Sequence, residues 1–237
     1  MSCEVIARQF KAGSQLVIAL DRTQWKEYNV LMVSDLVQKR AFPIFWTLLD
    51  KHGASNLVEQ QQVLRPVIRL LKRYKLVILG SARISQYRAG TIVTPQAFEF
   101  CYPSKKQHYF PRKKTALSIA KQPSGSTRNS SILSESRIPQ RKGFSRLNLV
   151  AYWKRQYRGK QEDEPWYLLT NLPDLKSAIG VYGQRYGLEA MFKDCKRGGY
   201  NLEGCQASSD KLISLIILIA LAMTSAWLKG KITQLQG

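Results

Sequence analysis

Cysteine and histidine are scarce in this sequence of 237 residues. Its 4 cysteines (Cys3, Cys101, Cys195 and Cys205) show neither a paired C-x-x-C spacing nor the density of a disulfide scaffold. A zinc site or a disulfide-stapled domain is therefore excluded as an organising feature. With only 2 histidines, a metal must be held by oxygen ligands. The cysteines are expected to be reduced thiols of a cytoplasmic protein.

Acidic residues are scarce as well. The chain has 16 Asp and Glu against 37 Lys and Arg, a formal net charge of +21. The surplus is spread along the chain, with +6 in residues 1–80, +8 in 81–139 and +7 in 140–237. Such a surplus indicates a polyanionic partner, and we favour nucleic acid over a solvated basic surface or a membrane-facing patch.

A secretory signal and long apolar runs are also lacking, with one exception. The N-terminus has no apolar core followed by a small-residue cleavage site. The run Leu212–Leu228 has 17 residues, the lower limit for a membrane-spanning helix, and contains Ser214, Thr224 and Ser225. We interpret it as a buried core helix and expect no membrane partner. The alternative is a small basic protein anchored in a membrane by this run.

The first third of the chain shows strand patterns followed by one helical pattern. Their order, three strands, a helix and a strand, predicts an α/β protein with a mixed sheet. The expected elements are a strand at Leu16–Leu20 that ends at Asp21, a hairpin of Tyr28–Val37 and Ala41–Leu49, a helix capped by Asn56, and a strand at Lys75–Gly80.

The regular spacing of apolar residues is lost after residue 80 and returns after residue 140. Residues 81–139 hold ten basic and two acidic residues without a sustained period, which predicts an irregular segment. After residue 140, alternation in GFSRLNLVAYWKRQYRGK and the run Trp166–Thr170 predict strands. Asn171 and Pro173 are expected to open a helix that covers about residues 174–197.

The most informative motif lies in VYGQRYGLEAMFKDCKRGGYN. Tyr182, Arg185, Glu189 and Lys196 follow one another with two, three and six residues between them. Offsets of three, four and seven place all four along one face of a single helix. That face would set one carboxylate among phosphate-seeking groups. The alternative is an exposed helix with an ordinary Arg–Glu pair at i,i+4.

With this motif the sequence resembles the insertion-sequence transposases of the DDE type that carry the YREK signature. LVIALDRTQW resembles the block with the first catalytic aspartate, QKRAFPIFWTLLDKHGASN the block that follows it, and YWKRQYRGK with PWYLLTNL the strands before the glutamate helix. The resemblance covers about residues 14–80 and 140–230. It implies an RNase H-like mixed sheet flanked by helices, with an inserted β-subdomain that is disrupted here.

The resemblance also implies a chemistry and its partners. In that family three carboxylates hold two divalent cations, Mg²⁺ or Mn²⁺, for in-line attack on a DNA phosphodiester. Asp21 then matches the first ligand and Glu189 the third, while Tyr182, Arg185 and Lys196 grip phosphates of the transposon end. The implied partners are double-stranded DNA of transposon ends and target, and a second copy in a synaptic homodimer. The implied location is the nucleoid within the cytoplasm.

A further DNA contact is expected from Trp153, in the segment that resembles the inserted β-subdomain. A tryptophan there is able to stack on an unpaired base during strand processing. The alternative is an aromatic side chain that only fills the core.

The second catalytic aspartate is missing from its expected place. The family block reads like DREF, whereas this chain reads GSARISQYRAG after KLVILG and has Ser81 at the carboxylate position. A neutral hydroxyl cannot replace a carboxylate that bridges two dications. Codons for Ala82–Gly90 can be chosen that spell REFHSIELA one nucleotide later, so we infer compensating frameshifts around residues 81–139.

The sequence therefore predicts the remnant of a decayed mobile element. The N-terminal DNA-binding region usual in such transposases is expected to be absent, because about twenty residues precede Asp21. Two functions stay open: a transposase with lost or impaired cleavage and strand transfer, or a dead DNA-binding fragment that interferes with intact transposase. The expected segments are 1–80, the first part of the catalytic core; 81–139, out of frame; 140–170, the subdomain remnant and return to the core; and 171–237, the C-terminal helices.

Overall fold

The computed structural model describes residues 11–80, 98–103, 130–133, 148–152 and 166–236. The chain divides into two compact units. Unit 1 comprises Met1–Val77 and Gly183–Gly237, and unit 2 comprises Ile78–Tyr182. The segments predicted from the sequence follow chain order, whereas unit 1 joins both ends of the chain. Ser81 and Trp153, two residues of the predicted site, lie outside the described residues.

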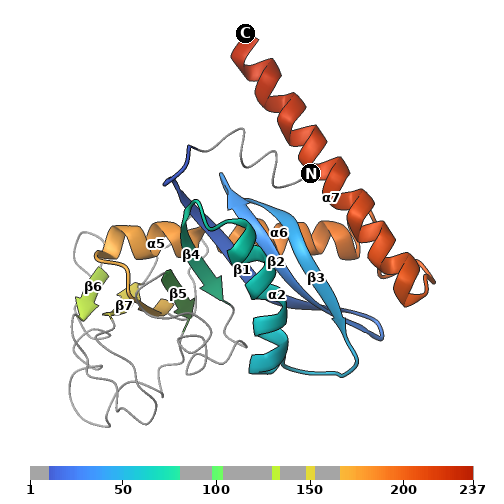
Figure 1. The fold of residues 1–237 in the computed structure, drawn as a ribbon, viewed down its shortest axis with the longest axis horizontal. Coiled ribbons are helices and arrows are strands. Elements are labelled where there is room, and N and C mark those ends of the chain that lie inside the picture. Colours follow the sequence, from blue (N-terminus) through green and yellow to red (C-terminus); the bar gives the residue numbers. More distant parts are fainter. Residues whose placement is uncertain (1–10, 81–97, 104–129, 134–147, 153–165, 237) are drawn as a thin grey trace, which may run out of the picture. The chain divides into compact units, whose positions relative to one another are not determined.

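Unit 1 is built on an antiparallel meander of three strands (Figure 1). The strand order in this unit is β3-β2-β1-β4, and the first residues of β4 belong to it. Two-residue turns join β1 to β2 and β2 to β3, so the predicted hairpin is confirmed. The strands are β1 (Gln15–Trp25), β2 (Tyr28–Val37), β3 (Arg40–Leu49) and β4 (Lys75–Gly80).

The predicted end of the first strand at Asp21 is wrong. Asp21 pairs with Met32, and the pairing continues to Trp25 opposite Tyr28. The residues after Asp21 are polar up to Gln24, but the strand continues to Trp25, which is buried. Asp21 therefore lies in the middle of β1, where both neighbouring peptides are held by the ladder.

Helix α2 (Leu57–Leu70) follows the predicted signal at its N-terminus. The Asn56 side chain accepts a hydrogen bond from the Glu59 amide, and the Glu59 carboxylate accepts one from the Asn56 amide. This capping box satisfies two amides that the helix leaves open. The apolar face of α2 packs on β2 and β3. Its buried side chains are Gln60, Val63, Leu64 and Val67.

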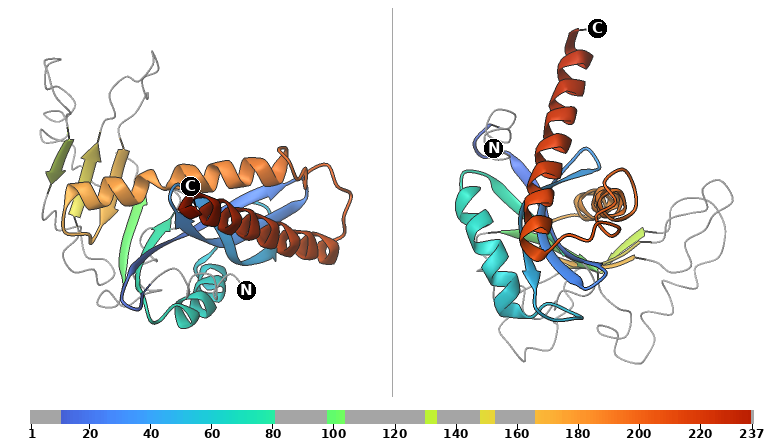
Figure 2. Two further views of the ribbon diagram at one scale, coloured as in Figure 1. Left: turned by 90° about the horizontal axis from the view of Figure 1, so that it is seen from above. Right: turned by 90° about the vertical axis from the view of Figure 1, so that its right-hand side faces the viewer.

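Helix α6 (Arg185–Lys196) covers the other face of the same strands. The Ser34 hydroxyl of β2 lies 4.0 Å from the sulfur of Met191 on α6. Figure 2 shows α2 and α6 on opposite sides of β1–β3. Unit 1 is therefore a layered α/β arrangement in which each sheet face packs on its own helix.

The single helix predicted for residues 174–197 is instead two helices. Helix α5 (Leu175–Gly183) ends before Gln184, and α6 begins after it. The Gly187 amide donates to the Gln184 carbonyl, an i→i+3 bond that interrupts the regular α-helical ladder. Gly183 at the break also has low helix propensity. As a result, Tyr182 belongs to α5 and unit 2, whereas Arg185, Glu189 and Lys196 belong to α6 and unit 1.

Unit 2 contains four further short strands and α5 (Figure 1). The strand order is β4-β5-β8-β7-β6, with antiparallel pairing from β5 onwards, and the last residues of β4 belong here. β8 coincides with the run predicted as a strand, which confirms that prediction. The strands are β5 (Glu99–Pro103), β6 (Ser130–Leu133), β7 (Asn148–Tyr152) and β8 (Trp166–Thr170).

The expectation that residues 81–139 are irregular is wrong for β5 and β6. In β5, Cys101 and Tyr102 are buried and the strand pairs with β8. The side chain of Asn171 pairs with the backbone at the start of β5: it accepts a hydrogen bond from the Phe100 amide and donates one to the Phe98 carbonyl. The aromatic run FEFCY is typical of strands and is a local signal for β5.

Helix α7 (Ser209–Gln236) is less buried than the sequence predicted. One stripe packs against unit 1, on β3 among other elements, and consists of Leu212, Ile216, Ile219, Ala220 and Thr224. The outer face exposes Ile213, Ile217, Leu218 and Ile232. Only 28% of the most apolar stretch of α7 is buried. The prediction of a buried core helix is therefore wrong for the outer face of α7. Within the described residues, Ser209–Gln234 is the one helix long and apolar enough to cross a membrane.

Candidate functional site

Asp21 projects from the sheet face that α6 covers. Directly opposed residues of an antiparallel pair point to the same face, and alternate residues of a strand share a face. Ala19 lies opposite Ser34, and Ser34 contacts Met191 of α6. Asp21, two residues beyond Ala19, is therefore on that face. Its side chain is half-buried, and its Oδ1 accepts a hydrogen bond of 2.7 Å from the Arg22 amide.

Glu189 lies on α6, the helix on the same side of the sheet as Asp21. Its side chain is 46% exposed, and its carboxylate forms an ion pair of 2.6 Å with Arg185, one helical turn earlier. A partly exposed pair of this kind contributes roughly 0–1 kcal/mol. The pair is therefore weak enough for a cation or a phosphate to compete for either partner.

Arg185 has unused hydrogen-bonding capacity. Its Nε atom is buried and has no hydrogen-bond partner among the described residues. A buried donor without a partner is costly, whereas an oxygen ligand that reached it would gain a charge-assisted bond. Arg185 is accordingly suited to contact a phosphate from α6.

Gly187 sets the distance between α6 and the sheet. A Cβ added there would lie 2.3 Å from the carbonyl oxygen of Lys39 and 2.8 Å from the Arg40 nitrogen. The absence of a side chain lets α6 rest directly on the backbone of the β2–β3 turn. This contact sets the position of Glu189, two residues further along the helix.

Lys196, the last residue of α6, is engaged with the loop that follows. Its Nζ lies 3.1 Å from one Glu203 oxygen, and the Arg197 Nε lies 2.6 Å from the other. The hydrogen bond from Arg197 is the main reason that the pKa of Glu203 lies below its usual range, and Lys196 adds to it. Glu203 thus pairs with both Lys196 and Arg197.

Tyr182 does not share an exposed face with the other motif residues. It is buried in unit 2, with its ring edge against Trp166 at a centroid distance of 4.7 Å. Trp166 in turn packs on Tyr152 at 5.5 Å. The prediction of four residues on one face of one helix is wrong for Tyr182, which lies in α5 and is buried against Trp166, whereas the other three belong to α6.

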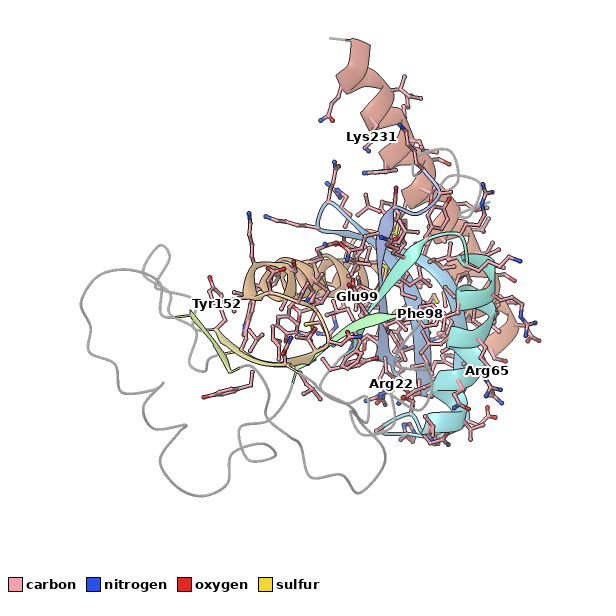
Figure 3. All side chains as sticks on the ribbon, turned by 60° about the vertical axis from the view of Figure 1, so that its left-hand side comes forward. Arg22, Arg65, Phe98, Glu99, Tyr152 and Lys231 are labelled. Carbon is pink, nitrogen blue, oxygen red and sulfur yellow. The ribbon has the colours of Figure 1, made fainter. Side chains whose placement is uncertain are left out.

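Arg22, next to Asp21 in the chain, projects from the opposite sheet face (Figure 3). Its Nη1 donates a 2.7 Å hydrogen bond to the Asn29 Oδ1, and Asn29 is fully buried. Asn29 also donates to the Lys51 carbonyl at 2.6 Å. This network anchors the loop after β3 and directs the Arg22 side chain away from Asp21.

The described residues do not fit a two-metal centre. No group of three His, Cys, Asp or Glu side chains within them is close enough to hold a metal ion. Asp21 and Glu189 supply two carboxylates on one side of the sheet, and Glu189 is already paired with Arg185. Divalent hard cations need more oxygen ligands than this pair offers.

A buried carboxyl group that the sequence analysis did not single out lies on the α2 side of the sheet. Asp35 follows Ser34 in β2 and therefore points away from α6. It is 3% exposed, and its Oδ1 has no hydrogen-bond partner among the described residues. Burial raises the pKa of Asp35 to about 7. A lone acid inside the apolar run YNVLMVSDLV was the available signal.

Comparison with known proteins gives no family assignment. No protein-family model matches the chain, and no curated protein matches it. Among solved structures, the chain is similar to the piggyBac transposase in a synaptic complex with hairpin DNA. The TM-score is 0.45 at 11% identity, over 94% of this chain and 54% of the other. The chain thus spans about half the length of that transposase chain.

Proposed function

We propose that this chain is a DNA-binding remnant of an insertion-sequence transposase of the DDE type, with an RNase H-like catalytic domain. The observation that carries the proposal is the placement of Asp21, which projects from the sheet face covered by the helix that bears Glu189. Both residues, from distant parts of the sequence, therefore lie on the same side of the sheet, with the Glu189 side chain on the exposed surface of α6. The YREK resemblance assigns metal-binding roles to these same two residues.

The DNA-binding part of the proposal rests on charge and on α6. A net charge of +21 favours a polyanion through release of its condensed counterions. Arg185 and Lys196 contact phosphates in this proposal, once DNA displaces the carboxylates of Glu189 and Glu203. Phosphate oxygens make the same charge-assisted hydrogen bonds as those carboxylates. Trp153 is the proposed stacking residue, and a second copy is the proposed partner in synapsis.

The catalytic part is proposed to be lost or strongly impaired. Mg²⁺ or Mn²⁺ would supply the activated nucleophile in an intact family member. Here Ser81 stands where the family has its second aspartate, and two carboxylates bind such a cation weakly. Genomic DNA around codons 80 to 140 would show the missing aspartate in another frame if the chain arose by frameshifts.

The purified chain is expected to bind duplex DNA without cleaving it. Binding should weaken as salt rises, with a slope of log K against log salt of about −0.9 for each phosphate contacted. Fluorescence anisotropy on a labelled transposon-end duplex measures the binding, and gel analysis with Mg²⁺ or Mn²⁺ measures cleavage. Metal-dependent cleavage that Glu189→Ala abolishes would refute the loss of activity. Absence of salt-dependent binding would refute the function as a whole.

Glu189→Gln is expected to strengthen DNA binding. The substitution removes the carboxylate that holds Arg185 and leaves the guanidinium available for a phosphate. The salt slope should become steeper by about 0.9, which corresponds to one additional contact. Glu27→Gln, at the exposed β1–β2 turn, is the matched control with the same charge change. Equal effects of both variants would show that only net charge matters.

A second candidate is a basic protein anchored in a membrane by α7. The observation that favours it is the exposed apolar outer face of this helix, with Leu218 at 60% exposure. Fractionation without detergent separates the two candidates. With lipid vesicles at high salt, a membrane protein floats with the lipid in a density gradient, whereas a DNA-binding remnant, soluble or self-associated, stays in the dense fractions.

A further inference from the structure

Unit 1 contains a second basic site, separate from Asp21 and Glu189. A groove of about 700 Å³ lies between the β2–β3 turn, α6 and α7. This volume is in the range of sites that take small ligands or short polymer segments. The side chains that give the groove its chemistry are Lys39, Arg40, Asp194, Tyr200, Trp227 and Lys231.

The groove carries a surplus of positive charge. Lys39, Arg40 and Lys231 line it together with one acid, Asp194. In the described part of the chain, no carboxylate forms an ion pair with any of these three cations. Arg185 and Lys196, by contrast, are both held by glutamates. The groove cations are therefore available to an anionic ligand.

Aromatic rings accompany these charges. Trp227 packs against Phe42 with ring centroids 5.3 Å apart, and the Lys231 Nζ lies 4.5 Å from the Trp227 centroid. Figure 3 shows Lys231 on the C-terminal part of α7. Tyr200 is 40% exposed at the groove. Cations beside accessible rings are the combination with which proteins bind single-stranded nucleic acid.

The turn that supplies Lys39 is conformationally costly. Gln38 and Lys39 have φ values of 50° and 65°, as a two-residue hairpin turn with two left-handed residues requires. Asn and Gly fit such a turn, whereas a residue with a longer side chain costs roughly 1–2 kcal/mol at a left-handed position. The backbone of Gly187 in α6 packs directly against the backbone of this turn. Costly backbone of this kind is often retained where a side chain has a function.

We propose that this groove binds a segment of single-stranded DNA. Lys39, Arg40 and Lys231 contact its phosphates, and a base stacks on Tyr200 at the rim. Asp194 opposes phosphate at its own position and accepts hydrogen bonds from N–H groups of bases there, which include N3–H of thymine. The proposal stands on the groove alone and does not depend on catalysis at Asp21 and Glu189.

The test compares two double variants of the full chain. Lys39→Asn with Lys231→Gln removes two groove cations, and asparagine tolerates the positive φ of Lys39. The control is Lys26→Asn with Lys211→Gln. Lys26 has a φ of 51° in the turn at the other end of β2, and Lys211 is an exposed lysine of α7. Both double variants therefore have the same net charge, and each replaces one lysine of positive φ in a hairpin turn and one lysine of α7.

The probe is an oligodeoxythymidylate of about eight nucleotides, within the range that such sites cover. We expect the groove variant to bind more weakly and to reduce the salt slope by about 1.4, or about 0.7 for each contact. The control should keep the slope of the unchanged chain. Tyr200→Leu should weaken binding without changing the slope, and Lys39→Asn alone serves if the double variant is unstable.

Three outcomes would overturn the proposal. The first is an equal loss in both double variants, which would mean that only net charge matters. The second is an equal loss for duplex and single strand in the groove variant, which would indicate a general phosphate contact. The third is full displacement of the oligonucleotide by inorganic phosphate at low millimolar concentration, which would indicate a small-anion site.

Discussion

Asp35→Asn is expected to stabilise the chain at pH 8 by up to about 4 kcal/mol and to have little effect near pH 3. Burial raises the pKa of Asp35 from its ordinary 3.8 to about 7 in the folded chain. Below pH 3.8 both the folded and the unfolded state carry the proton, so ionisation costs nothing. Between the two pKa values the unfolded state is ionised while the folded state keeps its proton, and stability falls as pH rises.

Urea unfolding between pH 3 and pH 8 measures this difference. The unchanged chain should lose stability across the interval relative to the variant, because asparagine has no charge to desolvate. Asp50→Asn, at an exposed position after β3, is the control and should follow the unchanged chain. Parallel curves for Asp35→Asn and the unchanged chain would show that Asp35 is hydrated or paired in the folded state.

Gly187→Ala is expected to destabilise unit 1 by about 1–3 kcal/mol. The new methyl group meets the Lys39 carbonyl oxygen at 2.3 Å and its carbon at 2.5 Å. These are backbone atoms of a constrained turn, so either the turn or α6 must move. Alanine favours the helix by about 1 kcal/mol over glycine, which offsets only part of this cost.

The matched control is Gly230→Ala in α7, where no atom lies within 4 Å of the added Cβ. This variant should gain stability, since only the helix-propensity term remains. Guanidinium unfolding, followed by far-ultraviolet circular dichroism, compares the two variants. An increase in stability for Gly187→Ala similar to that of Gly230→Ala would contradict the close packing of α6 on the turn.

Local signals made much of unit 1 predictable. Asn56 predicted the start of α2, and polar residues between two apolar runs predicted the β2–β3 hairpin. Each signal acts within a few residues and survives in the folded chain. The end of β1 was wrong because pairing with β2 continues past Asp21, and a single strand does not contain this information.

The candidate site was predictable in its residues but only partly in its arrangement. Spacing identified Arg185, Glu189 and Lys196, and all three lie on α6. The same spacing assumed a continuous helix, which the i→i+3 bond at Gln184 interrupts. The groove beside Trp227 was not predictable, because its walls come from a turn, α6 and α7, which only the tertiary fold brings together.

The outer face of α7 has a consequence for handling the protein in solution. A helix of 28 residues is about 42 Å long, and this one exposes Ile213, Ile217 and Leu218 in its first half and Ile232 near its end. Exposed apolar surface of this extent associates with itself or with other apolar material in water. Self-association, rather than unfolding, is therefore expected to limit the concentration at which this protein remains in solution. Its positive charge opposes that association least at high ionic strength, where repulsion between copies is screened.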